Sequence, residues 1–150
     1  MKHQLDIDGA VLQYLRDARA TALAELLAAI PAGVGNLMNQ ITTGRYGRVD
    51  GDGFDLHVWS DQKGAALELP EMSGGTVDQF YLSLRLEALR SIFPDDLPPL
   101  ILDDPLVSCD PQRRSRIVEI LDWHSEFGQV IYLTCHDWPE LERYPSLQLG

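Results

Sequence analysis

The chain has 150 residues, of which 45% are hydrophobic, so it is long enough for one compact domain with a core and too short for two. Its formal net charge of -11 argues against a nucleic-acid surface formed by this chain alone, because phosphate backbones bind clustered Lys and Arg. The first residues lack a secretory signal and no apolar run approaches the roughly 20 residues that span a bilayer, so we expect a cytoplasmic protein without a membrane segment.

The N-terminal part of the sequence is predicted to be helical. From Asp8 to Ile30, apolar residues recur with spacings of three and four, which places them in one stripe along a helix. The stripe consists of Val11, Leu12, Leu15, Ala18, Ala22, Leu23, Leu26 and Leu27. Pro31 and the glycines at 33 and 35 predict an interruption, followed by a shorter helix to about Ile41. The stripe needs a partner, and it fits equally an ordinary packing helix and the base of a coiled-coil arm.

Short β-rich segments follow, and we expect them to form an antiparallel meander. They are Tyr46–Val49, Phe54–Ser60 and Ala65–Leu69, with a turn signal at Asp50–Gly53. Apolar and polar residues alternate in the middle segment, which predicts one buried face and one partly solvated face. The buried face would carry Phe54, Leu56 and Val58.

The rest of the chain is predicted to fold as helix, strand, helix, strand. A helix that follows Gly75 ends before Pro94, and the strand Leu100–Asp103 comes next. The second helix begins at Pro111, is capped by Asp110 and continues to about Phe127. Residues 129–134 form a second apolar strand, and a strand, helix, strand order of this length is a right-handed parallel crossover. The expected fold class is α/β, with parallel core strands, crossover helices and the small antiparallel meander.

A pair of carboxylates at the end of the first core strand is the strongest chemical signal. Asp103 and Asp104 stand at the carboxyl edge, where parallel sheets bind ligands, and one acid can hold Mg2+ while the next faces a nucleophilic water. His136 ends the second strand, so the crossover brings its imidazole beside the two acids. For the acid pair alone, a helix-capping or turn role competes evenly with a catalytic one.

Residues 73–76, Ser-Gly-Gly-Thr, stand at a helix amino terminus, where free backbone N–H groups and the helix dipole favour a phosphate. An ordinary N-cap with a glycine-containing loop is the better interpretation of this segment alone.

Other residues that can carry chemistry are given structural roles. The remaining histidines, His3, His57 and His124, are assigned to the surface. The basic cluster of Arg113, Arg114 and Arg116 is predicted to be a solvated first helical turn. Cys109 and Cys135 lack the spacing of a zinc or redox motif, and we expect both as reduced thiols at the carboxyl edge of the sheet.

Taken together, the order and spacing of these segments resemble the carboxy-terminal head lobe of the SMC, SbcC and YhaN-type ABC ATPases. Met72–Leu86 resembles the signature motif with its helix, and Leu100–Asp104 resembles the Walker B strand. Ser108–Asp110 is similar to the D-loop, and His136 to the H-loop. The resemblance covers nearly the whole chain.

The resemblance implies ATP and Mg2+ as cofactors, with three residues at the reacting phosphate. Asp103 would assist Mg2+, Asp104 would polarise the attacking water, and His136 would sense the terminal phosphate. Many relatives have Glu where this chain has Asp104, and a shorter carboxylate would act through a further water, which leaves the turnover rate open.

Further residues would face a second head in a head-to-head dimer. Those of the signature motif would grip a nucleotide held by the opposing head, and those of the D-loop would line the interface. In this sequence they are Ser73, Gly74, Gly75, Thr76, Ser108 and Asp110.

An ABC head also needs a Walker A loop, GxxxxGK[ST], whose main chain and lysine hold the phosphates. The two lysines, Lys2 and Lys63, belong to no such motif. We therefore expect half a head: a stump of the returning coiled coil at 1–41 and the carboxy-terminal lobe at 42–150, in one domain overall. The loop would come from an amino-terminal lobe in another segment or chain.

We expect the chain alone to be inactive. Together with that lobe it would hydrolyse ATP and serve DNA repair or chromosome maintenance. It would reach DNA only through the wider complex. The alternative is a non-catalytic interaction module that docks on a partner's head. A metal-dependent phosphoesterase using Asp103, Asp104 and His136 is disfavoured, because the signature helix would then have no role.

Overall fold

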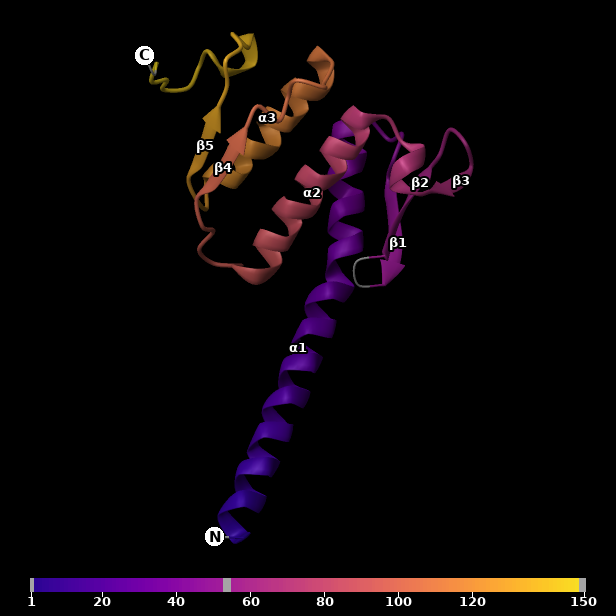
Figure 1. The fold of residues 1–150 in the computed structure, drawn as a ribbon. Helices are drawn as coiled ribbons and strands as arrows, with labels where there is room; N and C mark the ends of the chain where they lie inside the picture. Colours follow the sequence, from indigo (N-terminus) through magenta and orange to yellow (C-terminus); the bar gives the residue numbers. More distant parts are fainter. Residues whose placement is uncertain (1, 53–54, 149–150) are drawn as a thin grey trace.

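The longest element is a helix, α1, and all other elements pack around its second half (Figure 1). The computed structural model describes residues 2–52 and 55–148, apart from the side chains of residues 2–8, 26 and 52. In chain order the elements are α1 (Lys2–Thr42), β1 (Arg48–Asp52), β2 (Asp55–Ser60), β3 (Ala65–Leu67), η1 (Leu69–Glu71), α2 (Gly74–Ile92), β4 (Leu100–Asp103), α3 (Pro111–Ser125), β5 (Val130–Leu133) and η2 (Pro139–Leu141). The strands β1 to β3 lie on one side of the α1 and α2 pair, and β4, β5 and α3 lie on the other.

The predicted interruption at Pro31 was wrong, because α1 continues through this proline to Thr42. A proline in a helix interior costs about 3 kcal/mol. Against this cost, α1 buries several large apolar side chains from residue 30 onwards, each of which contributes about 1.5 to 3 kcal/mol. They are Ile30, Val34, Leu37, Met38 and Ile41. Tertiary packing therefore outweighs the local helix-breaking signal.

Gly33 and Gly35 let neighbouring elements approach α1 closely. A Cβ on Gly33 would lie 2.0 Å from Cδ of Glu87 on α2. A Cβ on Gly35 would lie 3.2 Å from the carbonyl oxygen of Gly47, just before β1. The glycines that indicated a helix break instead permit close packing on both sides of α1.

Two hydrophobic clusters form the core, one on each side of α1 and α2. Leu37 and Ile41 belong to the cluster that covers β4 and α3. Val34 and Met38, on the adjacent face of the helix, belong to the cluster that covers the meander. α2 is divided in the same way, because Leu86 packs in the first cluster and Phe80 in the second.

The antiparallel meander is confirmed, with β2 paired to both β1 and β3. Leu56 and Val58 are buried while His57 is partly exposed, as the alternation predicted. The predicted turn at Asp50–Gly53 was wrong for residues 50–52, which belong to β1 because they continue its pairing with β2. Gly53 and Phe54 lie outside the described residues.

The parallel crossover is also confirmed, with β4 and β5 in register from Leu100 opposite Val130 to Asp103 opposite Leu133. β5 is apolar throughout, but only one of its faces is covered. Leu102 of β4 is buried against α3 and α2, whereas Ile101 is 58% exposed and Leu133 of β5 is 42% exposed. The sheet thus has one open apolar face.

His124 is fully buried, so its assignment to the surface was wrong. It shares one face of α3 with Ile117 and Leu121, at spacings of seven and three, and this face packs into the core. Burial lowers the pKa of His124, and the positive charge of Arg90 lowers it further. The side chain of His3 lies outside the described residues.

The arginines at the start of α3 join elements together, so the prediction of a solvated first turn was wrong for them. Arg113 donates to Oε1 of Gln79 on α2 (3.1 Å), and Arg116 donates to the Gln40 carbonyl oxygen on α1 (3.1 Å). Arg114 donates to the Cys109 carbonyl oxygen (3.1 Å) and to Glu140 (3.3 Å). These hydrogen bonds hold the three side chains against neighbouring elements.

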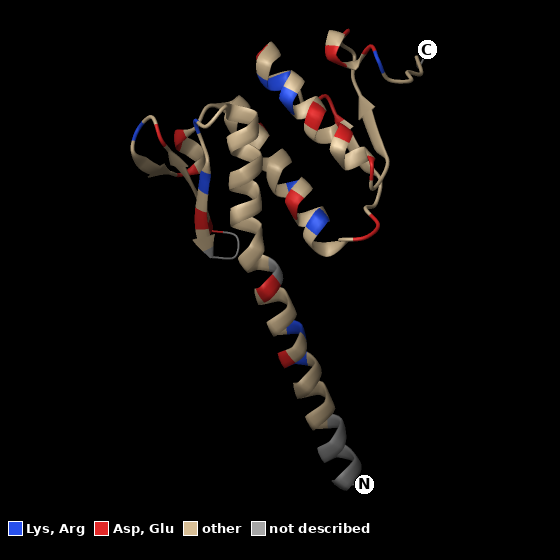
Figure 2. Cartoon of the chain, turned by 180° about the vertical axis from the view of Figure 1, so that it is seen from behind, with Lys and Arg blue, Asp and Glu red and all other residues tan. Residues whose placement is uncertain are grey.

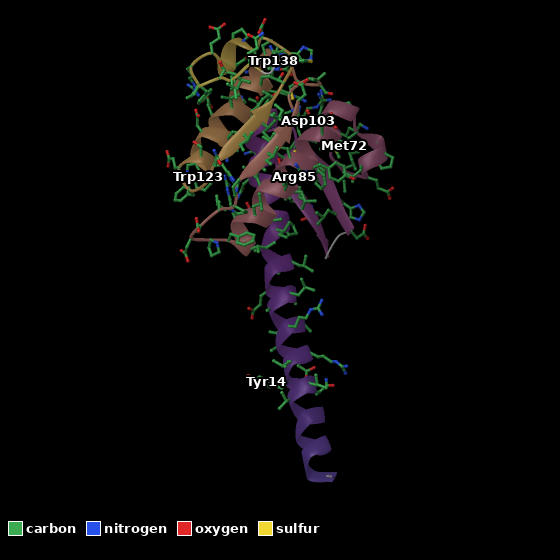
Figure 3. All side chains as sticks on the ribbon, turned by 60° about the vertical axis from the view of Figure 1, so that its left-hand side comes forward. Tyr14, Met72, Arg85, Asp103, Trp123 and Trp138 are labelled. Carbon is green, nitrogen blue, oxygen red and sulfur yellow. The ribbon has the colours of Figure 1, made fainter. Side chains whose placement is uncertain are left out.

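The first half of α1 extends away from the rest of the molecule, and Tyr14 projects from it (Figure 3). Val11, Leu12, Leu15 and Leu23 of the apolar stripe are exposed there. Within Gly9–Thr42, an 18-residue window has a mean hydropathy of 1.4, so this helix is long and apolar enough to cross a membrane by length and composition. The expectation that no segment meets this test was wrong, although part of the helix packs in the core.

Candidate functional site

Asp104 stands at the point where β4 ends, in a backbone conformation that turns its carboxylate toward β5. Its φ is +48°, in the left-handed region that non-glycine residues rarely adopt. The backbone N–H of Asp104 donates to the Leu133 carbonyl oxygen (2.8 Å), which ties the turn to the neighbouring strand. Strain of this kind is common where a side chain is positioned for function.

Three side chains from the end of β5 meet the Asp104 carboxylate. The Thr134 hydroxyl donates to Oδ1 of Asp104 (2.6 Å), and the Cys135 thiol lies 3.7 Å from Oδ2. Nε2 of His136 lies 3.5 Å from the same Oδ2. The structure thus brings Asp104 and His136 together.

The electrostatics of this cluster favour the ionised form of Asp104. The hydrogen bond from Thr134 is the largest cause that holds the pKa of the Asp104 carboxyl below its usual value. The charge of His136 acts in the same direction, while desolvation opposes both. Asp104 therefore remains a carboxylate, able to accept a proton or hydrogen bond.

Asp103 points to the opposite face of β4 from Leu102. It shares the open face with Ile101, because successive side chains of a strand alternate. Figure 3 shows Asp103 at the upper end of the strand. The two acids thus present carboxylates to different sides of the same strand end.

Residues 73–76 form the amino terminus of α2, with Ser73 as N-cap residue. The Ser73 and Thr76 hydroxyls lie 2.8 Å apart, and Thr76 is buried. A Cβ on Gly74 would meet no heavy atom within 4 Å, whereas a Cβ on Gly75 would lie 2.5 Å from the Ser108 carbonyl oxygen. The helix start is therefore held against the loop that follows β4, with Gly74 facing open space.

Ser108 and Asp110 belong to that same loop, between β4 and α3. The Asp110 carboxylate caps α3 by accepting from the backbone N–H of Arg113 (3.0 Å), as the sequence predicted. It also lies 3.3 Å from Nε of Arg113. Ser108 contacts Gly75 through its backbone, so the predicted signature and D-loop segments are neighbours in space.

Thr134 and Gln79 have contacts in the site that no sequence pattern predicted. Thr134 orients Asp104, and its hydroxyl also accepts from the backbone N–H of His136 (3.0 Å). Gln79 is buried on α2 and contacts both the Cys109 thiol (3.3 Å) and Arg113. The position of Thr134, a hydroxyl residue two positions before the strand-end histidine, could have indicated its role. No feature of the sequence indicates that Gln79, on an apolar helix face, contacts Cys109 and Arg113.

Cys135 lies beside Asp104 at the carboxyl edge of the sheet, whereas Cys109 lies in the loop between β4 and α3 and contacts Gln79. Cys109 is buried and Cys135 is exposed, and both are free thiols. Burial raises the pKa of the Cys109 thiol. A thiol reagent would therefore reach Cys135 first.

Lys and Arg are distributed over several elements. Figure 2 shows them on α1, β1, α2 and α3, with Asp and Glu between them. Arg114 lies near the site, because its guanidinium is 4.3 Å from the ring centroid of Trp138, and that ring is 5.0 Å from the His136 ring. That the chain alone forms no nucleic-acid surface stays a prediction from the net charge of -11.

Comparisons with known proteins give partial matches in sequence. No family model matches the chain. It is 32% identical over 99 residues to an uncharacterized protein of Mycobacterium tuberculosis, and 29% identical over 105 residues to YhaN of Bacillus subtilis, also uncharacterized. It is 34% identical over 99 residues to the DNA double-strand break repair Rad50 ATPase of Halobacterium salinarum. The alignments cover 61%, 69% and 61% of this chain, which spans only 11% of each relative.

Two solved structures that share part of this fold come from SMC proteins. One is the SMC head bound to the C-winged helix domain of ScpA, with a TM-score of 0.62 and 17% identity, covering 74% of this chain and 35% of that chain. Another comes from work on ATP-driven dimerization and DNA-stimulated activation of SMC ATPases, with a TM-score of 0.59 and 18% identity, covering 74% of this chain and 70% of that chain. The chain therefore has the fold of part of an SMC head and is similar to the carboxy-terminal lobe of SMC- and YhaN-type ATPases.

Proposed function

We propose that this chain is the carboxy-terminal half of an SMC-like ATPase head, which completes an ATP site with a Walker A lobe from another segment or chain. The observation that carries the proposal is the Asp104, Thr134 and His136 cluster at the edge of a sheet with one open face. The cluster supplies catalytic groups, and the open face supplies a place for the missing lobe.

The open face consists of apolar side chains of β4 and β5. Ile101 is 58% exposed, and Ile131 and Leu133 are also exposed. Parallel sheets are normally covered on both faces, and each strand of this two-stranded sheet has a free edge. A second lobe could pair its strands with a free edge of the sheet and cover the open face with a helix.

The residues at the strand ends fit the chemistry of ATP hydrolysis. Asp103 carries oxygen ligands of the kind that Mg2+ prefers, and an ion held there would neutralise phosphate charge at this edge. Asp104, kept ionised by Thr134, would orient the attacking water and accept its proton. His136, whose Nε2 lies 3.5 Å from Oδ2 of Asp104, would donate a hydrogen bond to the terminal phosphate.

The amino terminus of α2 would act on a second head. Gly74 faces open space, so a phosphate could approach the backbone N–H groups there without a steric clash. Because Gly75 touches Ser108, the start of α2 and the loop between β4 and α3 would move together. This contact would couple the nucleotide on the opposing head to the loop beside Asp104.

The free half of α1 would be the returning strand of a coiled-coil arm. Its apolar stripe is exposed, and a second helix would cover it. We place the complete protein in the cytoplasm, in DNA repair or chromosome maintenance, in line with the name of the Rad50 relative. DNA would be reached through the assembled complex.

The first test is ATP turnover by the purified chain with and without a Walker A lobe, taken from the adjoining reading frame or fused to Lys2. We expect no tight ATP binding and no hydrolysis by the chain alone, and both after the lobe is added. Robust turnover by the chain alone, with contaminants excluded, would contradict the proposal. A stable complex that binds but never hydrolyses ATP would favour the non-catalytic docking module.

The second test concerns the open face. Ile101→Glu places a charge at its centre and should prevent assembly with the Walker A lobe, measured by size-exclusion chromatography. Ile92→Glu is the matched control, because Ile92 is 51% exposed, similar to Ile101, but lies at the end of α2. Both variants should fold, since neither residue is buried. Equal assembly of the two variants would remove the open face from the proposal.

A further inference from the structure

The donor atoms of Asp104, Cys135 and His136 form a compact group at the carboxyl edge of the sheet. One ligand atom from each residue lies within 4.8 Å of the other two. Oδ2 of Asp104 is common to both measured contacts, at 3.7 Å from the Cys135 sulfur and 3.5 Å from Nε2 of His136. A carboxylate oxygen, a thiol and an imidazole nitrogen thus converge on one point.

Two of the three separations match those across a tetrahedral zinc ion. With Zn–O and Zn–N bonds of about 2.1 Å and a Zn–S bond of about 2.3 Å, tetrahedral angles place the oxygen about 3.4 Å from the nitrogen, and the sulfur about 3.6 Å from both. The observed distances from the oxygen, 3.5 Å and 3.7 Å, agree to within about 0.1 Å. All three atoms lie within 4.8 Å of one another, so binding one ion requires mainly that the exposed Cys135 and His136 side chains approach each other.

Neighbouring groups already orient the ligands. The Thr134 hydroxyl holds the other carboxylate oxygen, Oδ1 of Asp104, at 2.6 Å, which leaves Oδ2 free to face the sulfur and the imidazole. The same hydroxyl accepts from the His136 backbone N–H, so it also fixes the turn that carries the imidazole. Hydrogen bonds of this kind to ligating residues are typical of functional metal sites.

Access and ligand type favour a particular class of ion. Cys135 and His136 are exposed, so an ion can enter from solvent. Thiolate and imidazole ligands select zinc and similar transition metals, whereas Mg2+ takes oxygen ligands. Three protein ligands leave a fourth position open for water or another ligand.

We propose that Asp104, Cys135 and His136 form a binding site for Zn2+ or a transition metal of the same class, distinct from the Mg2+ that accompanies ATP. The site is complete within this chain. Because it uses the carboxylate of Asp104 and the imidazole of His136, bound zinc would withdraw both from catalysis. This regulatory consequence rests on the proposed function, whereas the metal site itself does not.

The test of the site uses the purified full chain, free of affinity tags, without nucleotide. Titration with Zn2+ by calorimetry should show one ion per chain, and titration with Co2+ should produce a thiolate-to-metal absorption band. A millimolar excess of Mg2+ should not displace either ion. Absence of stoichiometric zinc binding would overturn the proposal.

Variants identify the ligands. Cys135→Ser, His136→Gln and Asp104→Asn should each lower zinc affinity at least about 100-fold, and Thr134→Val about 10- to 100-fold, since ligand-orienting groups have effects of that size. Cys109→Ser and His57→Gln are controls and should bind zinc as the unaltered chain does. Circular dichroism checks that each variant folds. Unchanged affinity in Cys135→Ser or His136→Gln would overturn the assignment.

A second measurement depends on no substitution. Cys135 is exposed and should react with a small thiol reagent, whereas buried Cys109 should react slowly. One equivalent of Zn2+ should protect Cys135, as peptide mass spectrometry of the modified chain would show. Modification of Cys135 at the same rate with and without zinc would contradict a metal–thiolate bond.

The regulatory consequence is tested in the head reconstituted with a Walker A lobe. Zinc should inhibit ATP hydrolysis in the unaltered head, and Cys135→Ser should retain turnover while it loses this sensitivity. Equal inhibition of both heads would contradict regulation through this site. If the reconstituted head shows no turnover but the chain still binds zinc, the proposed function fails and the metal site stands.

Discussion

Gly75 lies so close to Ser108 that a Cβ on Gly75 would come within 2.5 Å of the Ser108 carbonyl oxygen. Gly75 is in the first turn of α2, and Ser108 is in the loop between β4 and α3. The contact joins two segments that are more than thirty residues apart in the sequence. Both are predicted to face a second head, so their relative position bears on the proposed function.

Because of this contact, we expect alanine substitutions at Gly74 and Gly75 to change the stability of the chain by different amounts. Gly75→Ala should lower the free energy of unfolding by about 1 to 3 kcal/mol, because backbone atoms of the loop must move to admit the methyl group. Gly74→Ala should change it by less than about 1 kcal/mol, since open space surrounds that position. Urea denaturation of both variants measures the difference. Equal stabilities would mean that the loop yields without cost.

His124 predicts a dependence of stability on pH. Its pKa is lowered in the folded chain by burial, so the unfolded chain binds a proton more readily. The free energy of unfolding should therefore fall as the pH drops below about 6.5, the usual value for histidine, until the folded chain also becomes protonated.

The variant His124→Leu should lose that part of the pH dependence, because it removes the buried titrating group. His57→Gln, on the partly exposed face of β2, is the control and should retain it. Denaturation curves between pH 5 and about 8 make the comparison, in the range where histidine titrates. A pH dependence that persists in His124→Leu would assign it to another group.

We expect Arg114 to stabilise the fold through the planar shape of its guanidinium group more than through its charge. Its guanidinium bonds to Cys109 and Glu140 and lies 4.3 Å from the ring centroid of Trp138. Arg114→Lys keeps the charge but loses the planar group that makes these contacts, and should cost about 1 to 3 kcal/mol. Arg48→Lys, in an exposed pair with Asp50, should cost less than about 1 kcal/mol. Thermal unfolding of both variants would reveal whether the two sites differ.

The two strand-end acids are expected to have separate roles in the reconstituted head. Asp104→Asn should abolish hydrolysis while ATP-dependent dimers persist or last longer, because it removes a base and keeps the shape. Asp103→Asn should instead weaken Mg2+-dependent nucleotide binding. Steady-state turnover and nucleotide affinity, measured on both variants, separate these effects. Identical behaviour would refute the division of roles.

We expect Ser73 to lie on the surface that faces the second head, where a large side chain would block dimerisation. Ser73→Arg should stop ATP-dependent dimerisation without unfolding the lobe, since a long cation would fill the space of the opposing phosphate. Nucleotide binding to a single head should survive. Ser115→Arg, on an exposed position of α3, is the control. Analytical ultracentrifugation with ATP gives the readout, and unchanged dimerisation of Ser73→Arg would exclude this role.

Local patterns in the sequence determined the order of elements and the edge at which the candidate site lies. Alternation along β2 gave its buried face, and the apolar runs at 100–103 and 130–133 with a helix between them required a parallel pair. Parallel strands end at the same edge, so Asp104 and His136 had to meet there. These features follow from strand periodicity and chain connectivity, which are properties of short segments.

Tertiary structure alone decided the features that depend on distant partners. Pro31 does not end α1 because buried residues on both sides of it outweigh the local cost. His124 is buried because one face of α3 enters the core, and Arg114 is held by Cys109 and Glu140. The orientation of Asp104 toward Thr134 and Cys135 depends on a left-handed turn that no sequence pattern marked. In each case the free energy comes from contacts between segments far apart in the chain, which the sequence order does not display.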